Sequence, residues 1–169
     1  MNLRERIAEA YLRQCSEITF KETTGFEFGD PTTLIEAYSI DGKEVGQFEA
    51  TVYLLDRESI SEYYCADEML QLIDANPSLS NSKGEVYVVE VIYSKLNRHE
   101  DRGRKCGLEG YLRLARHTLN SRTNGKPFLF IPNYCNPSDN ATTSGHARRV
   151  WASLSRVYES RGSVILFDR

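Results

Sequence analysis

The sequence predicts an α+β (α/β) fold built on a mixed sheet, and three observations support this. Two arms of alternating apolar residues flank Asp41-Gly42, the pattern of an antiparallel hairpin. Val86 to Tyr93 is apolar at nearly every position, as expected of a central strand covered on both faces. After it, helical and strand patterns alternate to the end of the chain, which favours a β-α-β-α-β back half behind the antiparallel front half.

In the front half, the apolar stripe of residues 2–15 predicts an amphipathic helix. Ile18 to Phe20 is expected to be a short strand, and Thr23 to Pro31 reads as a loop. The hairpin arms, residues 34–40 and 43–55, should join through a two-residue type I′ turn. Residues 59–75 are expected to form one helix.

The back half begins with the central strand and a polar, basic loop. The helix that follows carries one apolar stripe, made of Leu108, Tyr111, Leu112, Ala115 and Leu119. Residues 128–131 and 164–167 are expected to be strands, and a helix should run from about 146 to 160 with Gly162 as its C-terminal cap. Pro132 to Gly145 is a long polar loop, a feature that suggests function in a compact domain.

Length and composition indicate one domain spanning residues 1–169, with a core of ordinary size. No apolar run is long enough to cross a membrane, and the charged N-terminus does not read as a secretory signal. The four cysteines show no CxxC spacing, so reduced thiols and a cytoplasmic location are expected.

Charge is distributed unevenly along the chain. The net charge is −3, yet residues 95–126 contain nine Lys or Arg against three Asp or Glu. One basic segment in an acidic protein suggests a localised anionic ligand, although a solvated helix face would look the same. Nucleic acid is a less favoured partner because no aromatic residues are interleaved with the basic ones.

The basic segment places cationic side chains and glycines where the second-half helix begins. Main-chain N–H groups at such a position bind phosphate well. The predicted phosphate-binding residues are Arg102, Gly103, Arg104, Lys105, Cys106 and Gly107. The G-x-G-x-x-G and G-x-x-x-x-G-K-[ST] patterns are absent, so neither a dinucleotide fold nor a P-loop is indicated.

Two segments together resemble a known family. They are Arg102-Gly-Arg-Lys-Cys-Gly107-Leu-Glu-Gly110 after the central strand, and Val157-Tyr158-Glu-Ser-Arg-Gly162-Ser-Val-Ile165 near the end. Over residues 85–169 the chain is similar to GNAT-type, acyl-CoA-dependent N-acetyltransferases. The resemblance implies a GNAT-like mixed sheet with helices on both faces and acetyl-CoA as co-substrate. The glycine motif is degenerate: in one register Lys105 replaces its first glycine, and in the other, preferred on packing, Glu109 replaces the usual Gly or Ala.

The resemblance also implies roles for individual residues. The pantetheine arm of the cofactor would pair with the main chain of Val91, Ile92 and Tyr93, and Tyr158 would protonate the departing CoA thiolate. One asparagine of the long loop would contact the cofactor; Asn133, Asn136 and Asn140 are candidates, and Asn140 is assigned to the cofactor site.

Glu90 is the one charged residue of the predicted central strand, Val86 to Tyr93. Burial would raise its pKa toward the range of a useful general base, and acetylation of an amine requires removal of an ammonium proton. The alternative is a structural carboxylate that is hydrogen-bonded to the backbone or paired with an arginine.

The predicted function is transfer of an acetyl group from acetyl-CoA to an amine, on a small molecule or on a protein lysine or N-terminus, by direct attack. The alternative is a non-catalytic GNAT-like protein that has lost acyl-CoA binding and binds or regulates a protein partner. No metal is expected, because His99, His117 and His146 lack ligand spacing.

Overall fold

The computed structural model describes residues 2–7, 18–97, 106–137 and 145–169. Within these ranges a seven-stranded sheet has the order β1-β2-β3-β4-β5-β7-β6. Its strands are β1 Ile18–Glu27, β2 Asp30–Ser39, β3 Glu44–Leu55, β4 Val86–Leu96, β5 Phe128–Pro132, β6 Ser160–Arg161 and β7 Val164–Phe167. The helices are α2 Arg57–Ser61, α3 Ala66–Ala75, α5 Cys106–Ser121 and α6 Gly145–Val157, with 3-10 turns η1 Pro77–Leu79 and η2 Asn133–Cys135.

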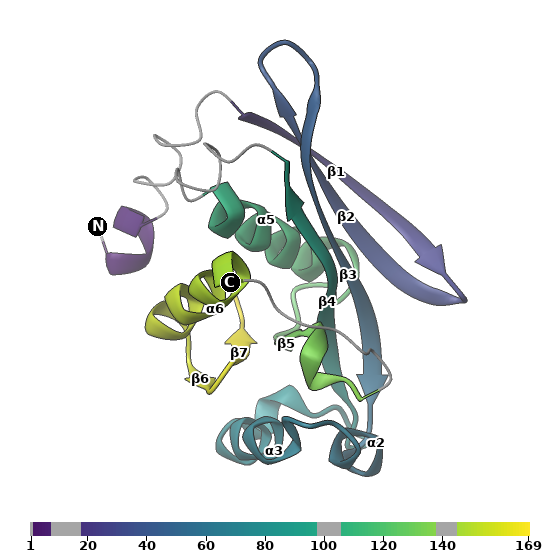
Figure 1. Ribbon diagram of the computed structural model, residues 1–169. Coiled ribbons are helices and arrows are strands. Elements are labelled where there is room, and N and C mark those ends of the chain that lie inside the picture. The colour runs from purple at the N-terminus through teal and green to yellow at the C-terminus, as the bar shows by residue number, and fades with distance from the viewer. Residues whose placement is uncertain (1, 8–17, 98–105, 138–144) are drawn as a thin grey trace.

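The sheet contains both antiparallel and parallel pairs, as the sequence predicts. Strands β1 to β4 pair antiparallel in chain order, β4 and β5 pair parallel, and β5, β7 and β6 pair antiparallel (Figure 1). The α+β prediction with a mixed sheet is therefore confirmed. Among the described residues, no helix is both long enough and apolar enough to cross a membrane.

Strand β4 lies between two hydrophobic layers, which confirms that the central strand is covered on both sides. Val89 and Val91 belong to the layer under α5 and α6, together with Phe48 and Trp151. On the opposite face, Val86 and Val88 belong to the layer under α2 and α3. Alternating side chains of one strand thus supply both layers, so almost every position of β4 must be apolar.

The front half differs from the expectation at β1, which is a ten-residue strand rather than a short one. The strand is hard to recognise from the sequence because it contains many polar residues. It lies at the edge of the sheet, where its outward side chains face water. Its turn to β2 is formed by Phe28 (φ 51°) and Gly29 (φ 86°), between the paired residues Glu27 and Asp30. Two consecutive positive φ values define a type I′ geometry, and a phenylalanine there is no sequence signal for it.

The predicted hairpin at Asp41-Gly42 exists, but its turn type is wrong. Ser39 N–H donates to the carbonyl of Lys43 at 2.8 Å, so the loop holds three residues, Ile40 to Gly42. Among its residues only Gly42 has a positive φ, 83°. A type I turn closed by a left-handed glycine satisfies these observations, whereas type I′ needs Asp41 in the left-handed region too.

Two helix predictions also need correction. Residues 59–75 are not one helix: Asp56 caps α2 by accepting from Ser59 N–H at 2.8 Å, and α3 starts only after Cys65. In the back half α6 ends at Val157, and Gly162, with φ 57°, forms the turn between β6 and β7 instead of the helix cap. At the N-terminus residues 3–7 are helical, and 8–17 lie outside the described residues.

The expectation of reduced thiols is wrong for two cysteines. Cys65 and Cys135 form a disulfide, with Cα atoms 5.4 Å apart and 70 positions apart in the chain. Such a separation gives no pairing signal in the sequence, because only the fold brings the residues together. Cys106 is buried and takes no part in this disulfide, and Cys15 lies outside the described residues.

Helix α5 approaches the sheet most closely at Gly110. A Cβ atom on Gly110 would lie 2.3 Å from the ring of Phe48, which is buried on β3. At Gly107, one turn earlier, the same atom would be 3.5 Å from Val150, an ordinary contact. Of these two helix glycines, Gly110 is therefore the one that packing requires.

We expect Gly110→Ala to destabilise the protein by about 1–3 kcal/mol, since the Phe48 ring must shift to admit the methyl group. Gly107→Ala is the matched control and should be neutral or stabilising by up to about 1 kcal/mol, because alanine favours helix. Urea unfolding measures both changes. Equal stability of the two variants would contradict the close approach.

Candidate functional site

The candidate site lies where β4 continues beyond its parallel neighbour β5. The last paired residues are Val91 and Pro132, after which the chain of β5 turns into η2. Strand β4 runs on to Leu96, paired with β3. In the described part of the chain, no strand lies beside residues 92–95 on the β5 side. We call this place the β4–β5 opening.

A bulge in β4 coincides with the start of the opening. Ala50 of β3 pairs with Val91 and Glu49 pairs with Tyr93, so Ile92 is the extra residue. The bulge reverses the alternation of β4: Val91 faces α5 before it, and Ser94 faces α5 after it. Bulges of this kind are common next to active sites because they redirect side chains.

Beyond the bulge, main-chain groups of β4 face into the opening. Asn97 N–H donates to the carbonyl of Val45 on β3 at 2.7 Å, and main-chain groups alternate in direction along a strand. The N–H and C=O groups of Ser94 therefore point to the β5 side. The opening thus presents a short strand edge inside the sheet, suited to an extended ligand with amide groups.

Glu90 lies at the inner end of the opening and is completely buried. It pairs in register with Thr51 on β3 and Ile131 on β5. Its Oε2 atom accepts a hydrogen bond from Asn136 Nδ2 at 3.0 Å. The carboxylate is thus held from the side of η2.

Two asparagines of the long loop bind β4, and sequence reasoning could not choose between them. Asn133 Nδ2 donates to the carbonyl of Ile92, the bulged residue, at 3.5 Å. Asn136 donates to Glu90. Their position in the sequence is the one feature that indicates a binding role. Both follow the carboxyl end of a parallel strand, where ligand-binding groups are often found. Asn140, the residue assigned to the cofactor site from the sequence, lies outside the described residues.

Helix α5 begins beside the far end of the opening. Gly107 in its first turn lies next to Leu96 of β4 and Val150 of α6, with the Cβ position 3.8 and 3.5 Å from their side chains. Cys106, the first residue of α5, is buried. The preceding residues of the predicted phosphate loop, Arg102, Gly103, Arg104 and Lys105, lie outside the described residues.

Glu109 stands where the GNAT glycine motif usually has glycine or alanine, and a neighbouring arginine compensates its negative charge. Arg113 Nε donates to Glu109 Oε1 at 2.8 Å, and the Glu109 side chain is almost fully buried. The Arg113 guanidinium in turn lies 4.6 Å over the ring of Phe20 on β1. Glu109 is therefore held on the β1 side of α5 by a charged partner.

Tyr158, predicted as a general acid, lies nearer the start of β5 than Glu90 does. Its ring packs 5.0 Å from that of Phe167, which pairs with Phe128 at the start of β5. Glu90 pairs with Ile131, three residues further along β5, which corresponds to about 10 Å. The Tyr158 hydroxyl donates to the carbonyl of Arg169 at 3.3 Å, and burial raises its pKa. The structure does not bring Tyr158 and Glu90 together.

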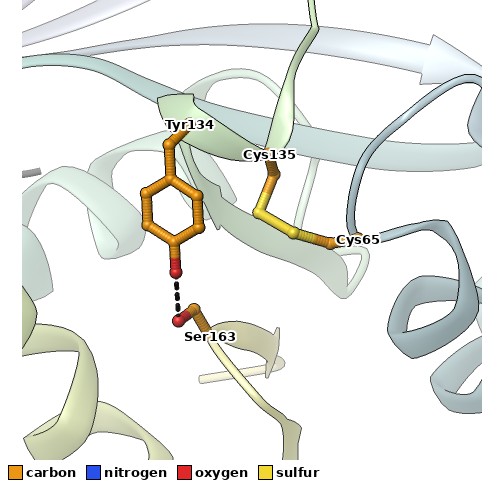
Figure 2. Close-up of a disulfide and its surroundings, with 4 residues drawn as sticks. All are labelled: Cys65, Tyr134, Cys135 and Ser163. Carbon is orange, nitrogen blue, oxygen red and sulfur yellow. Dashed lines mark hydrogen bonds between the residues drawn. A yellow bond between two sulfur atoms is a disulfide. The ribbon is translucent and has the colours of Figure 1, made fainter. Parts of the chain in front are cut away.

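A small pocket lies on the other side of η2, between α6 and the β6–β7 turn. It encloses about 230 Å³. Tyr134 of η2 forms one wall and donates a hydrogen bond to Ser163 Oγ at 2.5 Å (Figure 2). Arg148 and Trp151 of α6 form another wall. Among the described residues, no three His, Cys, Asp or Glu side chains gather to hold a metal ion.

Comparisons of the chain with protein-family models, with curated protein sequences and with solved structures gave no match.

Tyr111 of α5 braces β4 beyond the bulge, through a 2.7 Å hydrogen bond between its hydroxyl and Ser94 Oγ. Burial raises the pKa of Tyr111 to about 12. Between pH 10 and 12 the unfolded chain releases this proton while the folded protein keeps it, so stability falls as pH rises.

We therefore expect the Tyr111 contribution to lower the free energy of unfolding by about 1.3 kcal/mol between pH 9 and pH 11. Tyr111→Phe keeps the ring and removes this contribution. Urea unfolding at both pH values measures it, and the difference between the two proteins cancels the other tyrosines. Identical pH dependence of the two proteins would show that Tyr111 ionises normally when folded.

Proposed function

We propose that the protein is an N-acetyltransferase that moves an acetyl group from acetyl-CoA to an amine by direct attack. The observation that carries the proposal is the buried carboxylate of Glu90 at the inner end of the β4–β5 opening. The elements follow the order β4, α5, β5, α6 and β7, and the parallel strands β4 and β5 are paired only as far as Val91 and Pro132. This order supports the GNAT-like arrangement that the sequence resemblance implies.

The opening suits the cofactor in two respects. The pantetheine arm of acetyl-CoA is an extended chain with two amide groups, so it can pair with the edge of β4 at Ser94, beyond the end of β5, as an added strand would. The N-terminus of α5 beside Leu96 offers main-chain N–H groups for the diphosphate. The arginines and the lysine at 102–105 would add cationic donors.

Glu90 is the proposed general base. It takes a proton from the ammonium acceptor, and the amine lone pair then attacks the thioester carbonyl to form a tetrahedral intermediate. When this collapses, the C–S bond breaks, the nitrogen gives up a second proton to solvent, and the acetyl group stays on nitrogen as an amide. The Asn136 hydrogen bond favours the ionised carboxylate that such a base requires.

The leaving group does not require Tyr158. Thiols are much stronger acids than alcohols, with a pKa near 8.5 for cysteine, so a thiolate can leave without a general acid and take a proton from water. This agrees with the distance between the level of Tyr158 and that of Glu90 along β5.

A cationic acceptor fits the face of the sheet on which Glu90 lies. Glu49 pairs with Tyr93 and Thr51 pairs with Glu90, so all four side chains share the face opposite α5. Burial, and secondarily the charge of Glu27, raises the pKa of the Glu49 carboxyl. A positively charged amine approaching on this face would stabilise the ionised Glu49 carboxylate and offset the repulsion from Glu27.

Acetyl-CoA at one millimolar is expected to raise the melting temperature by about 5–10 °C, corresponding to roughly 2.7 kcal/mol if the ligand is present at 100 times its Kd. Pantetheine and ADP are the matched probes for the two halves of the site, and each should give a smaller shift. A melting temperature indifferent to acetyl-CoA would exclude the cofactor and favour the non-catalytic alternative.

Glu90→Gln should lower kcat by about 10²–10⁴-fold because the amide cannot accept the ammonium proton. The acetyl-CoA thermal shift should remain, since the substitution is isosteric. Glu62→Gln, at an exposed position between α2 and α3, is the control and should leave turnover unchanged. Turnover is measured as thiol release with a panel of amines, and wild-type kcat in Glu90→Gln would remove Glu90 as the base.

A further inference from the structure

The 3-10 turn η2 connects three different parts of the molecule. Asn133 at its start and Asn136 just after its end both donate to β4, at Ile92 O and at Glu90 Oε2. Cys135 lies between these asparagines and is bonded to Cys65. Tyr134 points to Ser163 on the β6–β7 turn, away from the disulfide (Figure 2).

The disulfide fixes η2 to the connection between α2 and α3. Beside it, Tyr64 N–H donates to the carbonyl of Cys135 at 2.9 Å, so one covalent bond and one hydrogen bond join the two segments. The turn itself is closed by Asn136 N–H donating to the carbonyl of Asn133 at 3.0 Å. The hydrogen bonds from Asn133 and Asn136 to β4 thus come from a short segment that the disulfide at Cys135 ties to the α2–α3 connection.

We propose that Cys65 and Cys135 are positioning residues whose disulfide holds η2 against β4, and that its reduction loosens η2 and changes the geometry of the β4–β5 opening. The disulfide is then a redox control on the site. Its effect on acetyl transfer rests on the proposed function, whereas the coupling between the disulfide and η2 does not.

The chemistry is thiol–disulfide exchange with a dithiol reductant. Cys65 is partly exposed and Cys135 is buried, so Cys65 is the proposed point of attack by an external thiolate. Its attack forms a mixed disulfide with Cys65 and releases the Cys135 thiolate, which takes up a proton. The second thiol of the reductant then displaces Cys65, leaving two protein thiols and an oxidised, cyclic reductant.

A purely structural disulfide would behave differently. It would stabilise the native state as a whole, and its loss would speed hydrogen exchange in every segment that opens by global unfolding. The positioning role instead predicts a local effect, confined to η2 and the segment it is tied to.

Amide hydrogen exchange in oxidised and dithiothreitol-treated protein tests this directly. Exchange at Tyr64 and Asn136, whose N–H groups bond across and within η2, should become at least about tenfold faster on reduction. Exchange at Leu114 and Ala115, in the middle of α5, should change less than twofold. Reoxidation should restore the slow rates.

Variants sharpen the result. Cys65→Ser with Cys135→Ser should exchange quickly at Tyr64 and Asn136 from the outset and should not respond to dithiothreitol. Asn136→Ala retains the disulfide, so its exchange at Tyr64 should still become faster with dithiothreitol. Equal acceleration in α5 and η2, or no acceleration in η2, would overturn the proposal, and the reduced wild type decides this even if the serine variant does not fold.

Acetyl-CoA affinity, measured by calorimetry in both redox states, separates the two proposals. A loss of about tenfold or more on reduction extends the control to the site. If acetyl-CoA binds neither form, the proposed function fails, and the exchange data still decide whether the disulfide positions η2. Unchanged affinity together with fast exchange in η2 would overturn the redox control of the site.

Discussion

The difference in length between two parallel neighbours is the constraint on which this molecule depends. Strand β4 spans Val86–Leu96 and β5 spans Phe128–Pro132, and the two are paired only as far as Val91 and Pro132. A parallel pair that ends early leaves main-chain groups in the interior of a sheet without a strand partner, a condition that proteins tolerate where a ligand or polar side chains can satisfy them. Asn133 already serves the carbonyl of Ile92 in this way.

The bulge at Ile92 begins where the pairing of β4 with β5 ends. Before it, Glu90 faces the layer under α3, and Val91 faces α5; after it, Ser94 faces α5 and meets Tyr111. A strand without the extra residue would direct the Ser94 side chain away from α5. The bulge therefore determines which side chains of β4 face α5 beside the opening, and Glu90 lies just before it.

Burial explains which parts of the fold the sequence predicts. The central strand, α5 and β7 were recognisable because their apolar patterns follow directly from the layers that they fill. Strand β1 was missed beyond Phe20 because an edge strand needs few apolar residues, and the turn at Phe28-Gly29 because phenylalanine is a strand former.

At the site, the buried acid of the central strand was predictable, since Glu90 interrupts an otherwise apolar run. Its partner Asn136 and the Cys65–Cys135 bond were not, because each joins positions far apart in the chain. The resemblance of Tyr158 to a tyrosine of the GNAT family did not predict where the residue lies. Its position beside Phe167 depends on where α6 ends, which the resemblance did not show.

The outermost strand of the sheet has one more consequence, for how copies of the protein meet in solution. The free edge of β1 is a template for sheet extension between molecules, and such edges seed aggregates unless they are protected. Lys21, Glu22 and Glu27 are all exposed along it. Bringing two such edges together antiparallel would desolvate these charges, so the charges of β1 oppose edge-to-edge pairing between copies of the protein.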